Sequence, residues 1–203
     1  MIARRAWRMV AALVLATATG VAAGRDQARE ADWRKVATTD DRARLRRWRA
    51  AWMEALAAAR ARDAGTTVAA DPALFDPDRA VSDAMLPAGR YRCRTTRLGM
   101  AGAARASAGW TTCSVAREDG ATGFEIQGTP RIRGRLYADG NARLVFLGTL
   151  GLGDERRMIG YGRDTSRDTA GLVERIGARR WRLVLPYPHF GGALDLVEIV
   201  PGG

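Results

Sequence analysis

"YADGNARLVF" (residues 137–146) places an Asp-Gly-Asn turn between two apolar runs. Glycine and asparagine adopt the backbone conformation of a tight hairpin turn at little cost. The stretch "ERIGARRWRL" (residues 174–183) repeats this arrangement around Gly177-Ala178. Consecutive hairpins without an intervening helix predict neighbouring antiparallel strands.

Short runs separated by turn residues continue on both sides of these hairpins, from Gly89 to the end of the chain. We expect strands near residues 90–97, 110–117, 123–127, 131–138, 142–150, 156–161, 170–176, 180–186 and 194–200. A sheet of so many antiparallel strands must curl or close on itself. The predicted fold is therefore mainly β with an N-terminal helix: an antiparallel, barrel-like or strongly bent β-meander, with one long amphipathic helix packed on it.

Residues 39–62 show a helical period instead. Large and small apolar residues recur there at intervals of three and four, which places them on one stripe of a helix. They are Leu45, Trp48, Trp52, Leu56 and Ala59. Such a stripe is typical of a helix that packs on its own sheet, and the alternative is a surface for a partner protein.

The N-terminus resembles a secretory signal peptide. Arg4, Arg5 and Arg8 flank the start of an apolar run at residues 9–18, and small residues follow at 21–23. The apolar run is shorter than the roughly 20 residues that span a bilayer. We expect cleavage after Ala23, a periplasmic or secreted location, and no transmembrane segment. The predicted organisation is a signal peptide at 1–23, an N-terminal segment with helix 39–62 and a loop at 24–88, and an antiparallel β domain at 89–203.

The chain is strongly basic, with a formal net charge of +11. Cleavage after Ala23 removes three arginines and no acid, which leaves +8 on 180 residues. This charge is consistent with an anionic partner. However, 32 arginines stand against one lysine, so a compositional bias is the alternative explanation. No nucleic-acid partner is expected for an exported protein, and the sequence predicts no oligomeric state.

Cys93 and Cys113 are the two cysteines of the chain. Strand alternation directs both side chains to the same side of a paired hairpin, as a cross-strand disulfide requires. An oxidising compartment favours such a bond. The spacing excludes a CxxC redox pair, and a zinc site would need more ligands than the single histidine supplies. We therefore predict a structural disulfide and no metal site.

Sequence signatures of catalysis are missing. The chain contains no GxSxG nucleophile turn and no phosphate-binding P-loop. His189, in "LPYPHFGG" (residues 185–192), has no neighbouring acid. We accordingly predict no catalytic residue and no cofactor.

A pair of carboxylates is the remaining catalytic route, because glycan hydrolysis needs only two acids at a suitable distance. The candidates are Asp154, Glu155, Asp164, Asp168, Glu174, Asp195 and Glu198. Glu174 and Glu198 share strand faces with apolar residues, where a carboxylate is costly unless it has a partner. The alternative for these acids is a buried ion pair with Arg175, Arg182 or another arginine.

Arginines recur at every second position in three predicted strands, so each set projects from one face. These sets are Arg90/Arg92/Arg94, Arg131/Arg133/Arg135 and Arg180/Arg182. Guanidinium groups recognise carboxylates and phosphates by paired hydrogen bonds. A solvated face that protects strands from aggregation is the alternative. The candidate ligand-binding residues are Arg92, Arg94, Arg133, Arg135 and Arg182, with Tyr161 and Tyr187 for apolar contact.

Several long stretches resemble one exported bacterial family, domain of unknown function 4893. They are "DWRKVATTDDRARLRRWRAAWMEAL" (32–56), "GRYRCRT" (89–95), "LVFLGTLGLGDERRMIGYGRD" (144–164), "RDTAGLVERIGARRWRLVLPYP" (167–188) and "LDLVEIVP" (194–201). The resemblance covers about residues 32–201. It implies a secreted domain with a disulfide and supplies no activity.

We expect a non-enzymatic binding domain for an anionic envelope component or an acidic protein. Two alternatives stay open. One is a small hydrolase of envelope glycan or ester that uses an acid pair or His189. The other is an assembly or inhibitor module that uses the Trp48/Trp52 helix.

Overall fold

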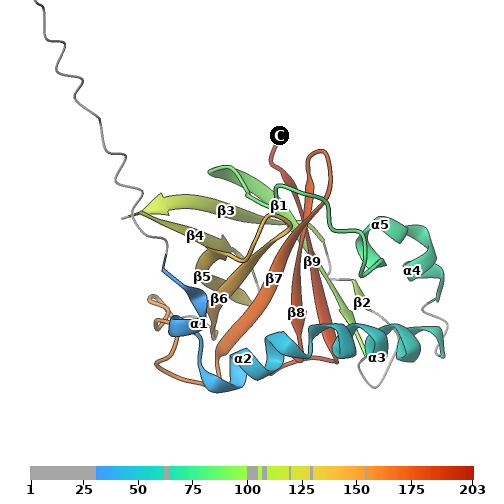
Figure 1. Cartoon of the computed structure of the whole chain (residues 1–203), viewed down its shortest axis with the longest axis horizontal. Helices are drawn as coiled ribbons and strands as arrows, with labels where there is room; N and C mark the ends of the chain where they lie inside the picture. The colour runs from blue at the N-terminus through green and yellow to red at the C-terminus, as the bar shows by residue number, and fades with distance from the viewer. Residues whose placement is uncertain are drawn as a thin grey trace, which may run out of the picture.

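A closed antiparallel β-barrel forms the body of the protein (Figure 1). The computed structural model describes residues 31–61, 65–99, 105–106, 109–118, 120–128, 130–153 and 155–203. The predicted signal peptide, residues 1–23, lies outside these ranges. The strands are β1 (Gly89–Leu98), β2 (Arg105–Ala106), β3 (Thr111–Glu118), β4 (Ala121–Ile126), β5 (Arg131–Ala138), β6 (Arg143–Gly151), β7 (Asp168–Gly177), β8 (Arg180–Pro186) and β9 (Leu194–Pro201).

The barrel closes because β1 pairs with β9 as well as with β3. Its register with β9 runs from Tyr91 opposite Pro201 to Leu98 opposite Leu194. The first half of β1 pairs with β3, and the two-residue strand β2 pairs with Thr96 and Arg97 further along. Eight strands, all except β2, make the wall in a simple meander. The predicted barrel-like meander is thus confirmed, and closure satisfies backbone groups that an open sheet would leave at its edges.

One predicted strand is wrong. Residues 156–161 belong to the long connection between β6 and β7 and form bends, irregular backbone and the start of a turn. Gly162, at the end of this stretch, has φ +80, a left-handed conformation that a continuing strand does not adopt. The segment instead runs along the outer wall of the barrel, where Tyr161 contacts the N-terminal helices.

The barrel interior is a packed core. Phe124 and Phe146 meet edge to face at 5.9 Å between ring centroids, and Tyr91 meets Trp181 in the same way at 6.1 Å. These residues belong to one hydrophobic cluster of buried side chains with Leu86. Leu86 comes from the segment before β1, where the N–H groups of residues 83 and 84 donate to the carbonyl of residue 141. This segment therefore covers one end of the barrel.

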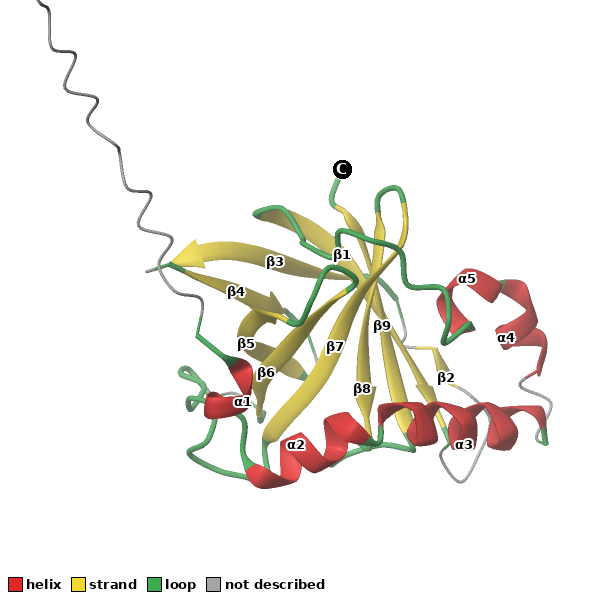
Figure 2. Ribbon diagram, viewed as in Figure 1, coloured by secondary structure: helices red, strands yellow, loops and turns green. Residues whose placement is uncertain are grey.

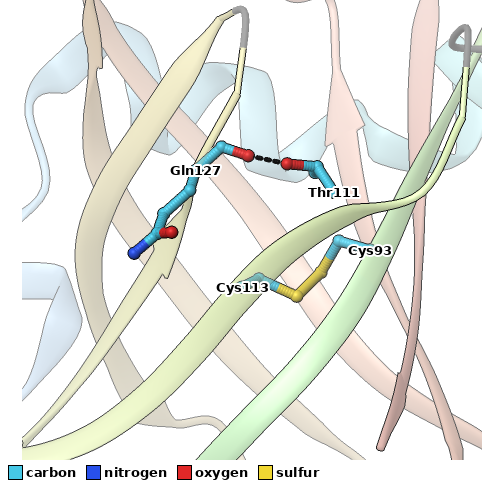
Figure 3. The surroundings of a disulfide bond; sticks show 4 residues. All are labelled: Cys93, Thr111, Cys113 and Gln127. Carbon is cyan, nitrogen blue, oxygen red and sulfur yellow. Dashed lines mark hydrogen bonds between the residues drawn. A yellow bond between two sulfur atoms is a disulfide. The ribbon is translucent and has the colours of Figure 1, made fainter. Parts of the chain in front are cut away.

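The disulfide joins the first two long strands of the wall (Figure 3). Cys93 and Cys113 are fully buried, and their Cα atoms lie 5.9 Å apart. Cys93 is opposite Thr111 in the register, so the bond crosses diagonally between β1 and β3. The Thr111 hydroxyl donates to the carbonyl of Gln127, just beyond β4 (Figure 3). The predicted structural disulfide is confirmed.

In the part of the chain that the structure describes, five short helices precede the barrel: α1 (Trp33–Val36), α2 (Thr39–Arg46), α3 (Trp48–Arg60), α4 (Gly65–Ala70) and α5 (Pro72–Phe75). The Thr38 hydroxyl accepts from the N–H of Asp41 and caps α2, and Asp71 caps α5 ahead of Pro72. Within the described parts of the chain, none of the helices is long and apolar enough to cross a membrane.

The prediction of one long helix over residues 39–62 is wrong, because the helix breaks at Arg47. Arg47 has φ −95 and ψ 9, outside the helical values. Figure 2 shows α2 and α3 following one another along the side of the barrel. Helix α2 contacts β7, whereas α3 contacts β8, β9 and β1. The wall curves between these strands, so one straight helix could not keep its apolar stripe on both.

The apolar stripe itself packs as predicted. Trp52 is fully buried and donates from Nε1 to the carbonyl of Phe75 at 3.1 Å. Leu45, Leu56 and Ala59 join it in a cluster with outward-facing residues of the barrel wall. The two hydrophobic clusters therefore lie inside the barrel and between its wall and the helices.

Candidate binding groove

A groove of about 480 Å³ lies on the outer wall of the barrel, over β3 to β6. Its far wall is the segment of residues 158–161 together with Val36 of α1. The residues that line it from the strands are Ser114, Ala116, Glu118, Ala121, Gly123, Phe124, Glu125, Arg133, Gly134, Arg135, Tyr137, Leu147 and Thr149. We refer to this site as the groove.

The floor of the groove consists of small side chains. Ser114 and Ala116 occupy alternate positions on β3, and Ala121 and Gly123 do so on β4. Alternate residues of a strand share one face, and the large residues between them, Phe124 among them, point into the barrel. A ligand could therefore approach the backbone of these two strands closely.

Arg133 and Arg135 supply the positive charge of the groove. Both side chains are exposed on β5, and no carboxylate within the described residues forms an ion pair with either. Three further exposed arginines, Arg156, Arg157 and Arg163, flank the segment that forms the far wall. These three arginines adjoin the far wall in the chain and are not among the residues that line the groove.

Two carboxylates offset part of this charge. Glu125 lies opposite Arg133 in the register of β4 and β5. Glu118 is the last residue of β3, beside the turn into β4. Neither acid forms an ion pair within 4.0 Å in the part of the chain that the structure describes. The lining thus carries two arginines and two acids, and Arg156, Arg157 and Arg163 add positive charge in the adjoining stretch of the chain.

Tyr161 anchors the far wall to the helices. Its hydroxyl donates to Asp41 Oδ2 at 2.6 Å and accepts from the N–H of Thr38 at 3.0 Å. Burial and the bond to Asp41 raise the pKa of the Tyr161 hydroxyl. Arg44 Nη1 donates to the other oxygen of Asp41 at 2.6 Å. The Tyr161 hydroxyl is therefore committed to the fold, and its ring contributes to the lining.

Asp168 lies on β7, opposite the groove-lining residue Thr149 of β6. It is 2% exposed, and its Oδ1 accepts from the N–H of Gly162 at 2.9 Å. Burial, followed by the charge of Asp41, raises the pKa of the Asp168 carboxyl. Its Oδ2 and the Oγ1 of the opposite residue, Thr149, are buried and find no partner among the described atoms. Because both oxygens are shielded from solvent, they are not in position for catalysis.

Arg92 and Arg94 of β1, which the sequence also suggested as ligand-binding residues, lie outside the groove. The guanidinium groups of Arg92 and Arg94 stack on Trp110, at 5.0 and 4.7 Å from its ring centroid. Arg94 also pairs with Glu198 at 2.7 Å. They form a separate surface near the disulfide, so the arginine sets of β1 and β5 do not share one site.

Arg182 cannot belong to a ligand surface, because its side chain is fully buried. It pairs with Glu174 at 2.6 Å and donates to the carbonyls of Leu74 and Asp76 at 2.9 and 2.7 Å. Glu174 accepts from Arg143 as well. We therefore remove Arg182 from the candidate ligand-binding residues.

Tyr187 and His189 lie in the connection between β8 and β9, away from the groove. The Tyr187 hydroxyl donates to Glu54 at 3.1 Å, and Arg47 stacks on its ring at 4.6 Å. His189 is exposed, and its Nε2 accepts from Arg44 at 2.9 Å. Neither residue contributes to the lining of the groove.

The acids considered for hydrolysis are mostly engaged with arginines. Glu174 and Glu198 form the predicted ion pairs, Glu155 and Asp164 both pair with Arg167, and Asp195 pairs with Arg97. Asp154 lies outside the described residues. In the described ranges, no group of three or more histidine, cysteine or acidic residues could hold a metal ion.

The sequence brought Arg133, Arg135 and Tyr161 to attention, and the structure places all three at one groove. It did not point to the small-residue floor or to the flanking arginines of the β6–β7 connection. The small-residue floor could have been found in the sequence, because small residues alternate at 114/116 and 121/123. Arg156 and Arg157 had no such signal, because the sequence predicts a strand over 156–161, and Arg163 lies just beyond that stretch.

Two comparisons with known proteins bear on this site. A family model described as "Domain of unknown function (DUF4893)" matches residues 33–199, which include every residue that lines the groove. A comparison with the curated proteins finds no match.

Proposed function

Since the chain belongs to the DUF4893 family, whose description names no activity, we propose a function from its own groove: an exported, non-enzymatic domain that binds an anionic ligand there. The ligand presents carboxylates or phosphates in a row, as an acidic envelope polymer or an acidic protein segment does. Arg133 and Arg135 contact its charges.

One observation carries this proposal. Arg133 and Arg135 line a concave site and form no ion pair with a carboxylate of the described residues. By contrast, ion pairs hold Arg143 on β6 and both Arg180 and Arg182 on β8. An arginine in an ion pair has its charge largely compensated. Exposed guanidinium groups outside ion pairs remain available for paired hydrogen bonds to an anion.

The size of the groove supports a ligand segment of moderate size. Sites for small ligands and cofactors commonly measure about 300–1,000 Å³, and the groove measures about 480 Å³. Its small-residue floor would let an extended chain lie close to β3 and β4. Glu118 and Glu125 would disfavour negative charge on that side, so the acidic groups of the ligand would face β5 and the β6–β7 connection.

Export is part of the proposal and rests on two observations. The sequence begins with the layout of a signal peptide, and Cys93 and Cys113 form a buried disulfide. Disulfides of this structural kind persist in oxidising compartments such as the periplasm.

The alternative functions lack a specific observation in their favour. For hydrolysis, the candidate acids among the described residues are held in ion pairs or shielded from solvent. For a partner-binding helix, Trp52 is fully buried in the protein's own core.

Binding of the mature protein to an acidic glycan, polygalacturonate, tests the proposal by calorimetry at low and moderate salt. We expect Arg133→Gln/Arg135→Gln to weaken binding about tenfold or more, because two charge-assisted contacts are lost. Gly123→Leu should weaken it similarly by filling the groove. A Cβ at Gly123 meets only an ordinary contact, 3.7 Å to the carbonyl of Ala116. Binding should also weaken as salt is raised, since salt screens exposed charges.

Arg90→Gln/Arg92→Gln is the matched control. It removes the same charge from alternate, exposed positions of β1 that do not line the groove. We expect this control to bind within about twofold of the unmodified protein. Equal losses of affinity in the two double variants would mean that binding depends on the overall charge of the protein. The groove would then no longer be the proposed binding site.

A further inference from the structure

A second cleft, of about 460 Å³, lies between the N-terminal helices and the outer wall of the barrel. It shares no lining residue with the groove. Its residues come from α1, α2, the start of α3, the β5–β6 turn, β6 and β7: Trp33, Arg34, Arg42, Leu45, Arg46, Trp48, Asp139, Arg143, Val145 and Leu172. We refer to it as the cleft.

The floor of the cleft is apolar. Leu45, Val145 and Leu172 are buried there, at the boundary between α2 and strands β6 and β7. Trp33 and Trp48 stand at its sides, and Trp48 is half-buried. A ligand that occupies the cleft must therefore offer an apolar body.

The tryptophan rings favour an aliphatic body over an aromatic one. The guanidinium carbon of Arg34 lies 4.4 Å from the centroid of the Trp33 ring, and that of Arg143 lies 4.4 Å from Trp48. Each ring thus has a face already covered by a cation. Fewer ring faces remain for stacking with an aromatic ligand, whereas a hydrocarbon chain needs only the apolar floor and the ring edges.

The rim of the cleft carries positive charge that the protein leaves uncompensated. Arg34 pairs with Asp139 at 3.1 Å, and Arg143 pairs with Glu174 at 2.6 Å. Arg42 and Arg46, by contrast, form no ion pair within the described residues. They are four positions apart on α2, a spacing at which like charges repel one another.

Hydrogen bonds to the protein fix the guanidinium of Arg42. Its Nη1 donates to the carbonyls of Arg34 and Ala37, at 3.0 and 2.6 Å, and its Nη2 donates to the Thr39 hydroxyl at 3.1 Å. Arg46 is exposed and lines the same cleft. An anion between the two guanidinium groups would offset their repulsion.

We propose that the cleft binds an unbranched aliphatic carboxylate, with its chain on the apolar floor and its carboxylate between Arg42 and Arg46. The charge of the rim selects the anion, and the floor selects the chain. This site is independent of the groove and of the function proposed for it.

Calorimetry with sodium octanoate, decanoate and dodecanoate, each below its micelle-forming concentration, tests the proposal on the mature protein. We expect one molecule bound per chain. Affinity should rise roughly two- to fourfold for each added methylene, because each one buries apolar surface. Affinity that does not depend on chain length would overturn the proposal.

Variants and a neutral amphiphile locate the carboxylate. Arg46→Glu should weaken dodecanoate binding about tenfold or more, because the new carboxylate pairs with Arg42 and repels the ligand. Arg60→Glu, an equally exposed change on α3 outside both sites, should leave affinity unchanged. Dodecyl maltoside, which has the same chain without charge, should bind at least about tenfold more weakly than dodecanoate.

Three results would contradict the proposal that dodecanoate binds in the cleft. They are equal affinity in Arg46→Glu and the unmodified protein, equal affinity for the neutral amphiphile, and loss of dodecanoate binding in Arg133→Gln/Arg135→Gln. The last result would place the carboxylate in the groove. Unchanged binding in that double variant supports the cleft as a separate site.

Discussion

Arg133 and Arg182 both point outward from alternating arginine sets of the barrel wall, and their environments are opposite. Arg133 is exposed at the groove, whereas Arg182 is fully buried against Glu174 and the carbonyls before and after Phe75. The α5 segment covers the wall at Arg182 and leaves it open at Arg133. Breaking the buried pair would leave an uncompensated charge, so Arg182 has a structural role.

Asp195 illustrates the same dependence on burial. Its side chain is 8% exposed, one oxygen has no partner among the described atoms, and the other lies 3.5 Å from Arg97 Nε. Burial raises the pKa of the Asp195 carboxyl to about 6, although Arg97 acts in the opposite direction. The folded protein therefore binds this proton more tightly than the unfolded chain does.

The free energy of unfolding should accordingly depend on Asp195 between about pH 4 and pH 6. A raised carboxyl pKa means that protonation stabilises the fold, and the contribution is lost as the pH rises through about 6. The full difference is about 3 kcal/mol. Relative to the native chain, Asp195→Asn should gain stability above pH 7 and little below pH 4. Urea unfolding at several pH values measures this difference, and a difference that does not change with pH would refute the assignment.

At the scale of elements, pattern alone located the strands but not the length of the helix. The alternation of residues predicted eight of the strands that form. The three-and-four period continues through residues 39–62 as if the helix were unbroken, yet α2 and α3 meet at Arg47. The period reports which residues face the core. It does not report the curvature of the wall on which they pack.

The disulfide between β1 and β3 should make a measurable contribution to stability. It closes a loop with a sequence separation of 20 residues, and the loop-entropy model assigns such a cross-link about 3 kcal/mol. Cys93→Ala/Cys113→Ala should lower the free energy of unfolding by about this amount in chemical denaturation. Reduction of the native protein is the independent control and should produce a similar loss. No change in either case would mean that pairing of β1 with β9 alone fixes this part of the barrel.

At the scale of the whole molecule, the N-terminal segment completes the barrel. Asp71 pairs with Arg180, Arg182 binds the carbonyls around α5, and Leu86 covers one end of the interior. Val36 of α1 also lines the groove, and the helices form one wall of the cleft. Both candidate sites thus need the segment before residue 89 as well as the barrel.

The proposed export concerns the whole chain and can be measured directly. In bacteria that produce the full sequence, we expect the protein in the periplasmic or extracellular fraction. Its mass should correspond to a start at Gly24, with both thiols protected from alkylation. A variant lacking residues 1–23 should stay in the cytoplasm with its thiols reduced. Recovery of the full-length chain inside the cell with alkylatable thiols would contradict both the leader and the proposed compartment.

The sequence by itself determined the positions of eight strands, the alternation of side chains along them and the disulfide, because turn residues and a period of two are local properties of the chain. It also selected Arg133, Arg135 and Tyr161 as candidate ligand contacts. The tertiary structure decided which outward arginines remain exposed and placed Tyr161 beside two of them. It also created the cleft between α2 and the barrel. These outcomes depend on how distant segments cover the wall, and no local pattern encodes that coverage.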